Sequence, residues 1–152
     1  MKELELRRHA KRDPDQDRLS DEGLAQAQDL GREAAEWWAA VFVSPAQRAA
    51  ETAAHILRGA GSQLPPEHRI VPGLAGQDPS GGSPEAMAAG IRALLLEVPD
   101  GGRGLAISHT PFVERAAFGL TGDEVAPMRE CEGILVTAED DHIGVAELRL
   151  PG

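Results

Sequence analysis

Leu6-Arg7-Arg8-His9-Ala10 follows directly on a short run, residues 3–6, in which glutamate and leucine alternate. The alternation predicts a strand over residues 2–8, so the histidine stands where the strand gives way to a loop. An imidazole is a nucleophile that is partly neutral near pH 7, and a guanidinium binds phosphate oxygens without losing its charge. Arg8 and His9 together therefore suggest phosphoryl transfer, although the pair alone also fits a surface position without a role.

Composition and charge narrow the class of protein. The 152 residues are enough to bury a core, and 41% of them are apolar. The net charge of −10 argues against a nucleic-acid or membrane partner, so an anion site must be a local cluster of positive charge. The single cysteine, Cys131, excludes an internal disulfide. We expect one domain over residues 1–152, cytoplasmic and monomeric, with no signal peptide, no membrane span, no metal and no cofactor.

Apolar periodicity and capping residues predict alternating strands and helices. Ser20 is expected to cap the first helix, and Ser44-Pro45 and Thr110-Pro111 are each interpreted as a cap followed by a first helical residue. The expected helices cover residues 23–38, 44–58, 84–97 and 110–120, and the expected strands cover 2–8, 41–43, 69–71, 104–107, 133–137 and 143–150. This order predicts a three-layer α/β/α sandwich with a mostly parallel sheet and an antiparallel edge at its C-terminal hairpin.

One feature conflicts with that fold. A central parallel strand should be apolar on both faces, yet Glu3 and Glu5 give the first strand a charged face. Either a polar layer covers this face or charges pair on it, for example Glu5 with Arg7. The sequence leaves this choice open.

Three polar groups stand where expected strands end, which is where open α/β sheets bind ligands. They are Arg8-His9, the segment from Ser44 to Arg48, and Ser108-His109. Arg48 falls near the start of a helix, where backbone N–H groups favour an anion. Together they suggest that His9 attacks phosphorus while positively charged and hydrogen-bonding groups neutralise the phosphoryl oxygens.

These motifs resemble the histidine phosphatase superfamily, which includes the cofactor-dependent phosphoglycerate mutases. The Arg-His-Gly signature of the family corresponds to Arg8-His9-Ala10, and its Ser-Pro-x-x-Arg-x-x-x-Thr segment corresponds to residues 44–52. The form of residues 8–11 and the lack of a large insertion are most similar to small SixA-like phosphohistidine phosphatases. The resemblance implies that His9 accepts the phosphoryl group and that phosphate is bound by Arg8, Arg48, His109 and Ser44.

The sequence departs from the family at the proton donor. Many members carry a glutamate after the third strand, where this chain has Gly73. Asp78 is the nearest candidate in the loop that follows. The weaker candidates are Asp13, Glu85 and Glu132.

We therefore expect a phosphatase that acts on phosphomonoesters or phosphohistidine through a phosphohistidine intermediate on His9. Its substrate would be a phosphorylated small molecule or a phosphohistidine-bearing protein. Two alternatives stay open: a phosphatase of sugar or metabolite phosphates in the same superfamily, and a phosphate-binding module without turnover.

Overall fold

A six-stranded sheet forms the centre of the computed structural model, which describes residues 1–34, 38–62, 68–75 and 83–151. The strand order is β3-β2-β4-β1-β5-β6. The strands are β1 (Lys2–Arg8), β2 (Ala40–Val43), β3 (Arg69–Ile70), β4 (Arg103–Ser108), β5 (Gly133–Glu139) and β6 (His142–Leu148). β1 pairs in parallel with β4 and antiparallel with β5, and β5 pairs antiparallel with β6. The expected mostly parallel sheet with an antiparallel edge is confirmed.

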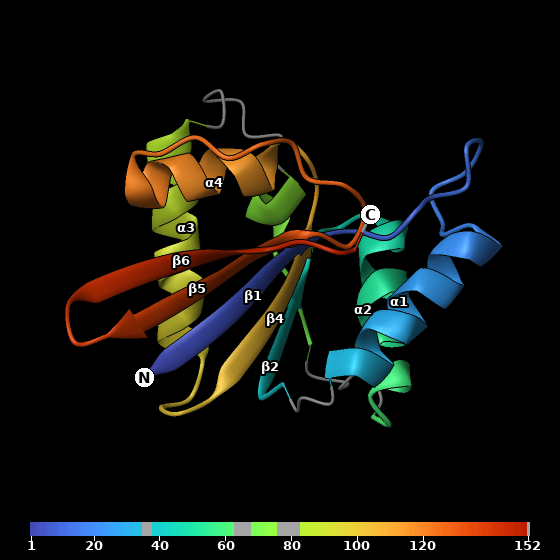
Figure 1. The fold of residues 1–152 in the computed structure, drawn as a ribbon, viewed down its shortest axis with the longest axis horizontal. Coiled ribbons are helices and arrows are strands. Elements are labelled where there is room, and N and C mark those ends of the chain that lie inside the picture. Colours follow the sequence, from blue (N-terminus) through green and yellow to red (C-terminus); the bar gives the residue numbers. More distant parts are fainter. Residues whose placement is uncertain (35–37, 63–67, 76–82, 152) are drawn as a thin grey trace.

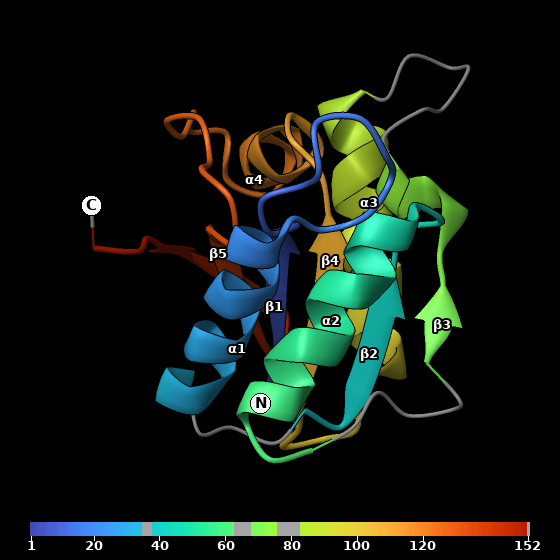
Figure 2. The same cartoon turned by 90° about the vertical axis from the view of Figure 1, so that its right-hand side faces the viewer.

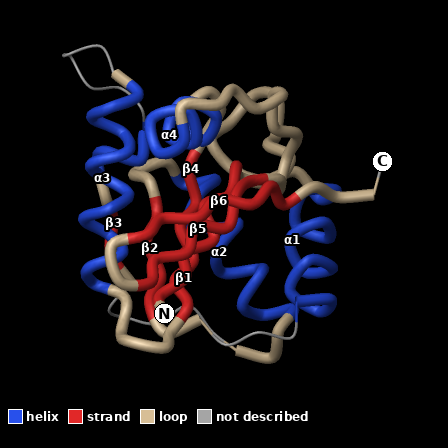
Figure 3. The backbone as a smooth tube through the Cα atoms, turned by 60° about the vertical axis from the view of Figure 1, so that its left-hand side comes forward, coloured by secondary structure: helices blue, strands red, loops and turns tan. Residues whose placement is uncertain are grey.

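Two helical layers cover the sheet (Figures 1 and 2). α1 (Asp21–Ala34) and α2 (Gln47–Gly59) lie on one face, and α3 (Pro84–Glu97) and α4 (Phe112–Thr121) lie on the other. The tube in Figure 3 shows the same three layers from another side. Each face has its own apolar cluster, so the core is divided by the sheet. In the described part of the chain no helix is long and apolar enough to cross a membrane.

α1 and α2 pack closely because glycine removes side chains at their contact. A Cβ atom at Gly31 would lie 1.9 Å from the carbonyl oxygen of Ile56, and one at Gly59 would lie 2.0 Å from that of Gln28. Both neighbours are backbone atoms that cannot move aside, so this helix pair requires glycine at both positions.

Ion pairs and hydrogen bonds satisfy the charged residues on one face of β1. Leu4 and Leu6 lie fully buried under α3 and α4, while Glu5 and Arg7 point to the opposite face. Arg7 Nε donates to Oε1 of Glu5 at 2.9 Å, and Trp38 Nε1 donates to Oε2 at 2.7 Å. A buried carboxylate is tolerated when it is paired and hydrogen-bonded in this way, and the expected Glu5–Arg7 pair is therefore confirmed.

Two expected helix starts are wrong. α2 begins at Gln47 rather than at Pro45, and α4 begins at Phe112 rather than at Pro111. The Ser44 and Thr110 side chains are engaged elsewhere, with His109 and Glu114 respectively, so neither caps the following helix. Ser20 does cap α1, because its Oγ accepts from the N–H of Gly23 at 3.1 Å.

The first helix also ends differently from the expectation. α1 ends at Ala34, whereas the periodicity predicts a helix to residue 38. Residues 35–37 lie outside the described residues, and Trp38 is not helical; its indole Nε1 donates to Glu5.

Candidate active site

The candidate site lies at the carboxyl ends of three neighbouring strands. His9 follows β1, Ser44 follows β2, and His109 follows β4, which lies between the other two. Parallel strands in this order end at the same edge of the sheet, which is the usual ligand-binding edge of such folds. The fold therefore brings together residues that are up to a hundred positions apart.

His9 is held in one tautomer. Its Nδ1 lies 2.7 Å from the carbonyl oxygen of Ala10, and a carbonyl only accepts, so Nδ1 carries the proton. Nε2 then keeps its lone pair and accepts from Nε of Arg48 at 3.3 Å. Burial, with the residue only 6% exposed, is the main reason that the pKa of His9 is lowered from its ordinary value. The result is a neutral imidazole with its unprotonated nitrogen in the site.

His109 stands beside His9 as a second neutral ring. The ring centroids are 5.2 Å apart at an interplanar angle of 65°. Nη2 of Arg48 donates to Nδ1 of His109 at 3.3 Å, and the ring places Nε2 2.6 Å from Oγ of Ser44. Burial lowers the pKa of His109 to about 4, with the neighbouring charges adding to the effect. Ser44 thus lies behind His109 and orients it.

Asp17 occupies the N-terminus of α2. Its carboxylate accepts from the backbone N–H of Gln47 at 2.9 Å and of Arg48 at 3.2 Å, and from Nη1 of Arg48 at 2.8 Å. These hydrogen bonds outweigh the effect of burial and lower the pKa of Asp17. The expectation that these N–H groups favour a ligand anion is corrected, because the chain fills the position with its own carboxylate.

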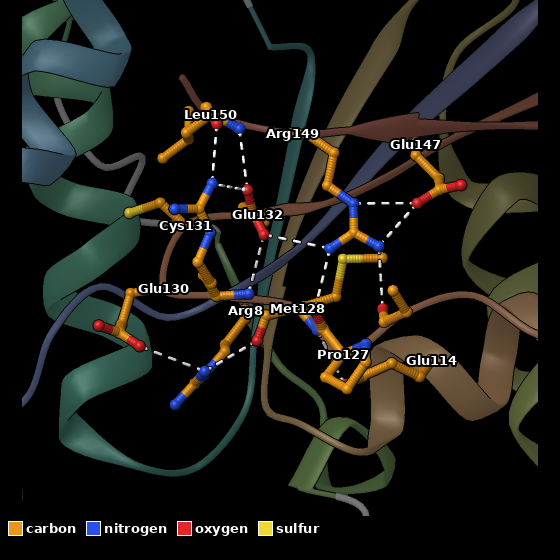
Figure 4. A network of polar contacts seen from close by, with 12 residues as sticks. Arg8, Glu114, Pro127, Met128, Glu130, Cys131, Glu132, Glu147, Arg149 and Leu150 are labelled. Atoms are coloured by element: carbon orange, nitrogen blue, oxygen red, sulfur yellow. Dashed lines mark hydrogen bonds and ion pairs between the residues drawn. The ribbon is translucent and has the colours of Figure 1, made fainter. Parts of the chain in front are cut away.

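Arg8 is held by the segment that leads into β5 (Figure 4). Its Nη1 donates to the carbonyl of Met128 at 2.8 Å and pairs with Oε2 of Glu130 at 3.2 Å. The N–H of Cys131 donates to the carbonyls of both Arg8, at 3.1 Å, and His9, at 3.3 Å. Cys131 has a positive φ of 66° and is fully buried, which indicates a structural role.

Glu132 anchors the same segment to the C-terminal tail (Figure 4). Its buried carboxylate accepts from Arg129 and from Leu150 N–H at 3.0 Å, and from Nη1 of Arg149 at 3.1 Å. Burial alone would raise the pKa of Glu132, but these hydrogen bonds outweigh it and lower the pKa to about 2. The tail after β6 therefore stabilises the position of the segment before β5 that contacts Arg8.

Two hollows meet at His9 and Arg48. The larger, of about 490 Å³, is lined by these two residues with His109, Thr110, Pro45, Ala46 and Ala75. The smaller, of about 270 Å³, is lined by them with Arg8, Lys11, Arg12 and Glu130. The structure thus places His109 in one hollow and Arg8 in the other, with His9 and Arg48 lining both, whereas Ser44 lines neither.

The expected proton donor is not placed by the structure. Asp78 lies outside the described residues, Glu85 is exposed at the start of α3, and Asp13 pairs with Arg18. The carboxylates next to the site, Glu130 and Asp17, were missed by sequence reasoning. No spacing signal could have found them, because each reaches the site through a loop.

The fold and the site define a class of protein: an α/β/α sandwich that presents an imidazole with an unprotonated nitrogen beside two guanidinium groups. The chain belongs to the histidine phosphatase superfamily (branch 1), whose sequence profile matches residues 3–78. A comparison with curated protein sequences gives no match. Family membership indicates a hydrolase of the histidine phosphatase class.

Solved structures share the fold at low sequence identity. The protein histidine phosphatase SixA in complex with tungstate superposes with a TM-score of 0.75 at 22% identity, covering 97% of this chain and 96% of that one. A phosphoserine phosphatase mutant from Entamoeba histolytica in complex with phosphoserine gives 0.76 at 16%, covering 98% and 97%. Phosphoglycerate mutase from Bacillus anthracis gives 0.77 at 15%, covering 96% and 92%. These similarities show the phosphoglycerate mutase-like fold.

Proposed function

We propose that this protein is a phosphatase that hydrolyses phosphomonoesters or phosphohistidine through a phosphohistidine intermediate on His9. The observation that carries the proposal is the hydrogen bond from Nδ1 of His9 to the Ala10 carbonyl, which leaves the Nε2 lone pair facing the site. Family membership supports the same chemistry. A binding module would need the arginines but would not need an oriented nucleophile.

In the proposed reaction, Nε2 of His9 attacks phosphorus and the bond from phosphorus to the leaving group breaks. The leaving group departs with the electron pair and takes up a proton. Arg8, Arg48 and His109 stabilise the equatorial oxygens, where charge is spread in the transition state. Water then attacks phosphorus, the P–Nε2 bond breaks, and phosphate leaves as His9 regains its lone pair.

Hydrolysis of 4-nitrophenyl phosphate by the wild type and by His9→Ala tests the proposal. His55 is a matched control, since its Nδ1 lies 2.9 Å from the side chain of Gln28 on α1, outside both hollows. We expect His9→Ala to lose nearly all turnover, and His55→Ala to keep it. We also expect an acid-labile, base-stable phosphoryl label on the wild type that His9→Ala lacks. Full activity in His9→Ala would refute the nucleophile assignment.

A further inference from the structure

Both arginines that face His9 already carry a carboxylate partner. Arg8 pairs with Glu130 at 3.2 Å, and Arg48 pairs with Asp17 at 2.8 Å. His109 adds no charge at pH 7, because burial lowers its pKa to about 4. The two ion pairs and His109 therefore sum to zero charge, whereas a bound phosphoryl group brings up to two negative charges.

Arg12 is the uncompensated cation in the smaller hollow, which it lines together with Arg8, His9 and Arg48. Its Nε donates to the carbonyl of Asp13 at 3.1 Å, and its Nη2 donates to that of Gln16 at 3.2 Å. Both acceptors are neutral, and within the described ranges no carboxylate forms an ion pair with Arg12. Lys11, the other basic residue of that hollow, is paired with Glu22 at 2.7 Å.

The loop that carries Arg12 is held in place at several points. The backbone of Arg12 bridges to Leu19, and Oδ1 of Asp13 accepts from the N–H of Asp15 at 2.8 Å. Further along the loop, Asp17 is bonded to the first residues of α2. The Arg12 guanidinium is thus preorganised, and its binding to an anion does not require the loop to be ordered first.

From this arrangement we propose that Arg12 is a further anion-binding residue, whose guanidinium supplies the net positive charge that holds the phosphoryl group in front of His9. The inference rests on the proposed function of the site. The charge of Arg12 also acts on His9, as one of the smaller causes after burial that lower its pKa. Two of its donors are used by the loop, so the remaining N–H groups are available for phosphoryl oxygens.

Calorimetric binding of inorganic phosphate tests the inference without requiring turnover. We compare Arg12→Gln and Arg12→Lys with Arg18→Gln, a control that removes the same charge from the same loop but from a residue paired with Asp13. Arg12→Gln removes a charged donor to the bound anion and should raise the Kd for phosphate about tenfold or more. Arg12→Lys should retain part of the affinity, and Arg18→Gln should stay within about twofold of the wild type.

Equal phosphate affinities in Arg12→Gln and Arg18→Gln, with both proteins folded by circular dichroism, would overturn the inference. Weaker binding of pyrophosphate with unchanged binding of phosphate would also overturn it, because Arg12 would then serve a second anionic group. The proposed function fails separately, if the wild type binds phosphate but neither hydrolyses an aryl phosphate nor becomes labelled on His9.

Discussion

Nε of Arg48 donates to Nε2 of His9 across 3.3 Å, while Nη2 of the same side chain lies 3.3 Å from Nδ1 of His109. One planar guanidinium therefore contacts both imidazoles, and Asp17 holds its remaining edge at 2.8 Å. A bound oxyanion would accept hydrogen bonds from Nε and Nη2 of Arg48 without a change in the positions of these atoms.

Replacing Arg48 by lysine should test this geometry, because lysine keeps the charge but loses the planar set of donors. We expect Arg48→Lys to lower kcat/KM for 4-nitrophenyl phosphate by about 100-fold, the scale typical of losing one transition-state donor. Arg58→Lys, at the exposed last turn of the same helix, is the control and should be unchanged. Wild-type activity in Arg48→Lys would mean that catalysis requires the positive charge at this position but not the planar set of donors.

Removing the carboxylate that pairs with Arg8 should strengthen anion binding. In Glu130→Gln the guanidinium keeps its place through Met128 but is no longer neutralised by a partner. A partly exposed ion pair is worth about 0.2–1 kcal/mol, so the Kd for phosphate should fall by up to about fivefold. Glu124→Gln, at an exposed position before this segment, provides the charge-matched control. Weaker phosphate binding in Glu130→Gln would show that Glu130 positions Arg8 rather than competing with the ligand.

Much of this site follows from local sequence signals, and part of it does not. A strand followed by a histidine occurs twice, at His9 and His109, and the parallel sheet places both at the same edge. Periodicity likewise locates the helices to within a few residues, since burial of one helix face is a local pattern.

The misplaced start of α2 has a physical cause that no local pattern contains. Ser44 has the composition of a cap, but its hydroxyl contacts His109, which is 65 residues away. Ser44 Oγ also accepts from the N–H of Ala46, but the N–H groups of Gln47 and Arg48 are taken by Asp17, from 30 residues before the helix. Tertiary hydrogen bonds replaced the local cap, so spacing alone could not have predicted the position.

Glu132 should be important for stability even though it lies outside both hollows. Removing one partner from a buried ion-pair network costs about 3–5 kcal/mol, so Glu132→Gln should lower the free energy of unfolding at pH 7 by about that amount. Glu147→Gln, which removes the half-exposed partner of the same Arg149, should cost under about 1 kcal/mol. Urea unfolding at pH 7 compares the two variants directly.

The same variant gives a pH dependence with a definite sign. The pKa of Glu132 is about 2 in the folded protein against an ordinary 4.5. Its stabilisation is therefore fully present above pH 4.5 and is lost as the pH falls towards 2. The stability difference between the wild type and Glu132→Gln should shrink over that window. A difference that stays constant down to pH 2 would contradict the ionised network.

The leaving group should determine which substrates are hydrolysed. The family resemblance leads us to expect an acid after the third strand, where this chain has Gly73, and general acid catalysis contributes about 10²–10⁴-fold. An imidazole or a phenolate leaves with little help, whereas an alkoxide requires protonation. We expect turnover of phosphohistidine and aryl phosphates and poor turnover of phosphoglycerate. Comparable rates for aryl and alkyl phosphates, reduced for the alkyl substrate alone by Asp78→Asn, would instead identify Asp78 as the acid.

His109 should couple anion binding to protonation. In the empty site burial lowers its pKa to about 4, so the folded protein keeps the ring neutral while an unfolded chain would protonate it near 6.5. A bound dianion beside Arg48 and His109 favours the imidazolium and raises its pKa, because opposite charges attract strongly in a partly desolvated site. Sulfate is a suitable probe, since it keeps two negative charges between pH 5 and pH 8.

Because sulfate binds the protonated form better, its affinity should rise as the pH falls from 8 towards 5. Each unit by which sulfate raises the pKa of His109 corresponds to about 1.36 kcal/mol, or about tenfold in the affinity for the protonated form over that for the neutral form. Calorimetry at several pH values measures the dependence, and NMR titration of the ring signals assigns the proton to His109 rather than to His9. His109→Asn should bind sulfate with a much flatter pH profile. An unchanged profile in His109→Asn would assign the proton uptake to His9, the other imidazole of the site, and would mean that His109 stays neutral when the anion binds.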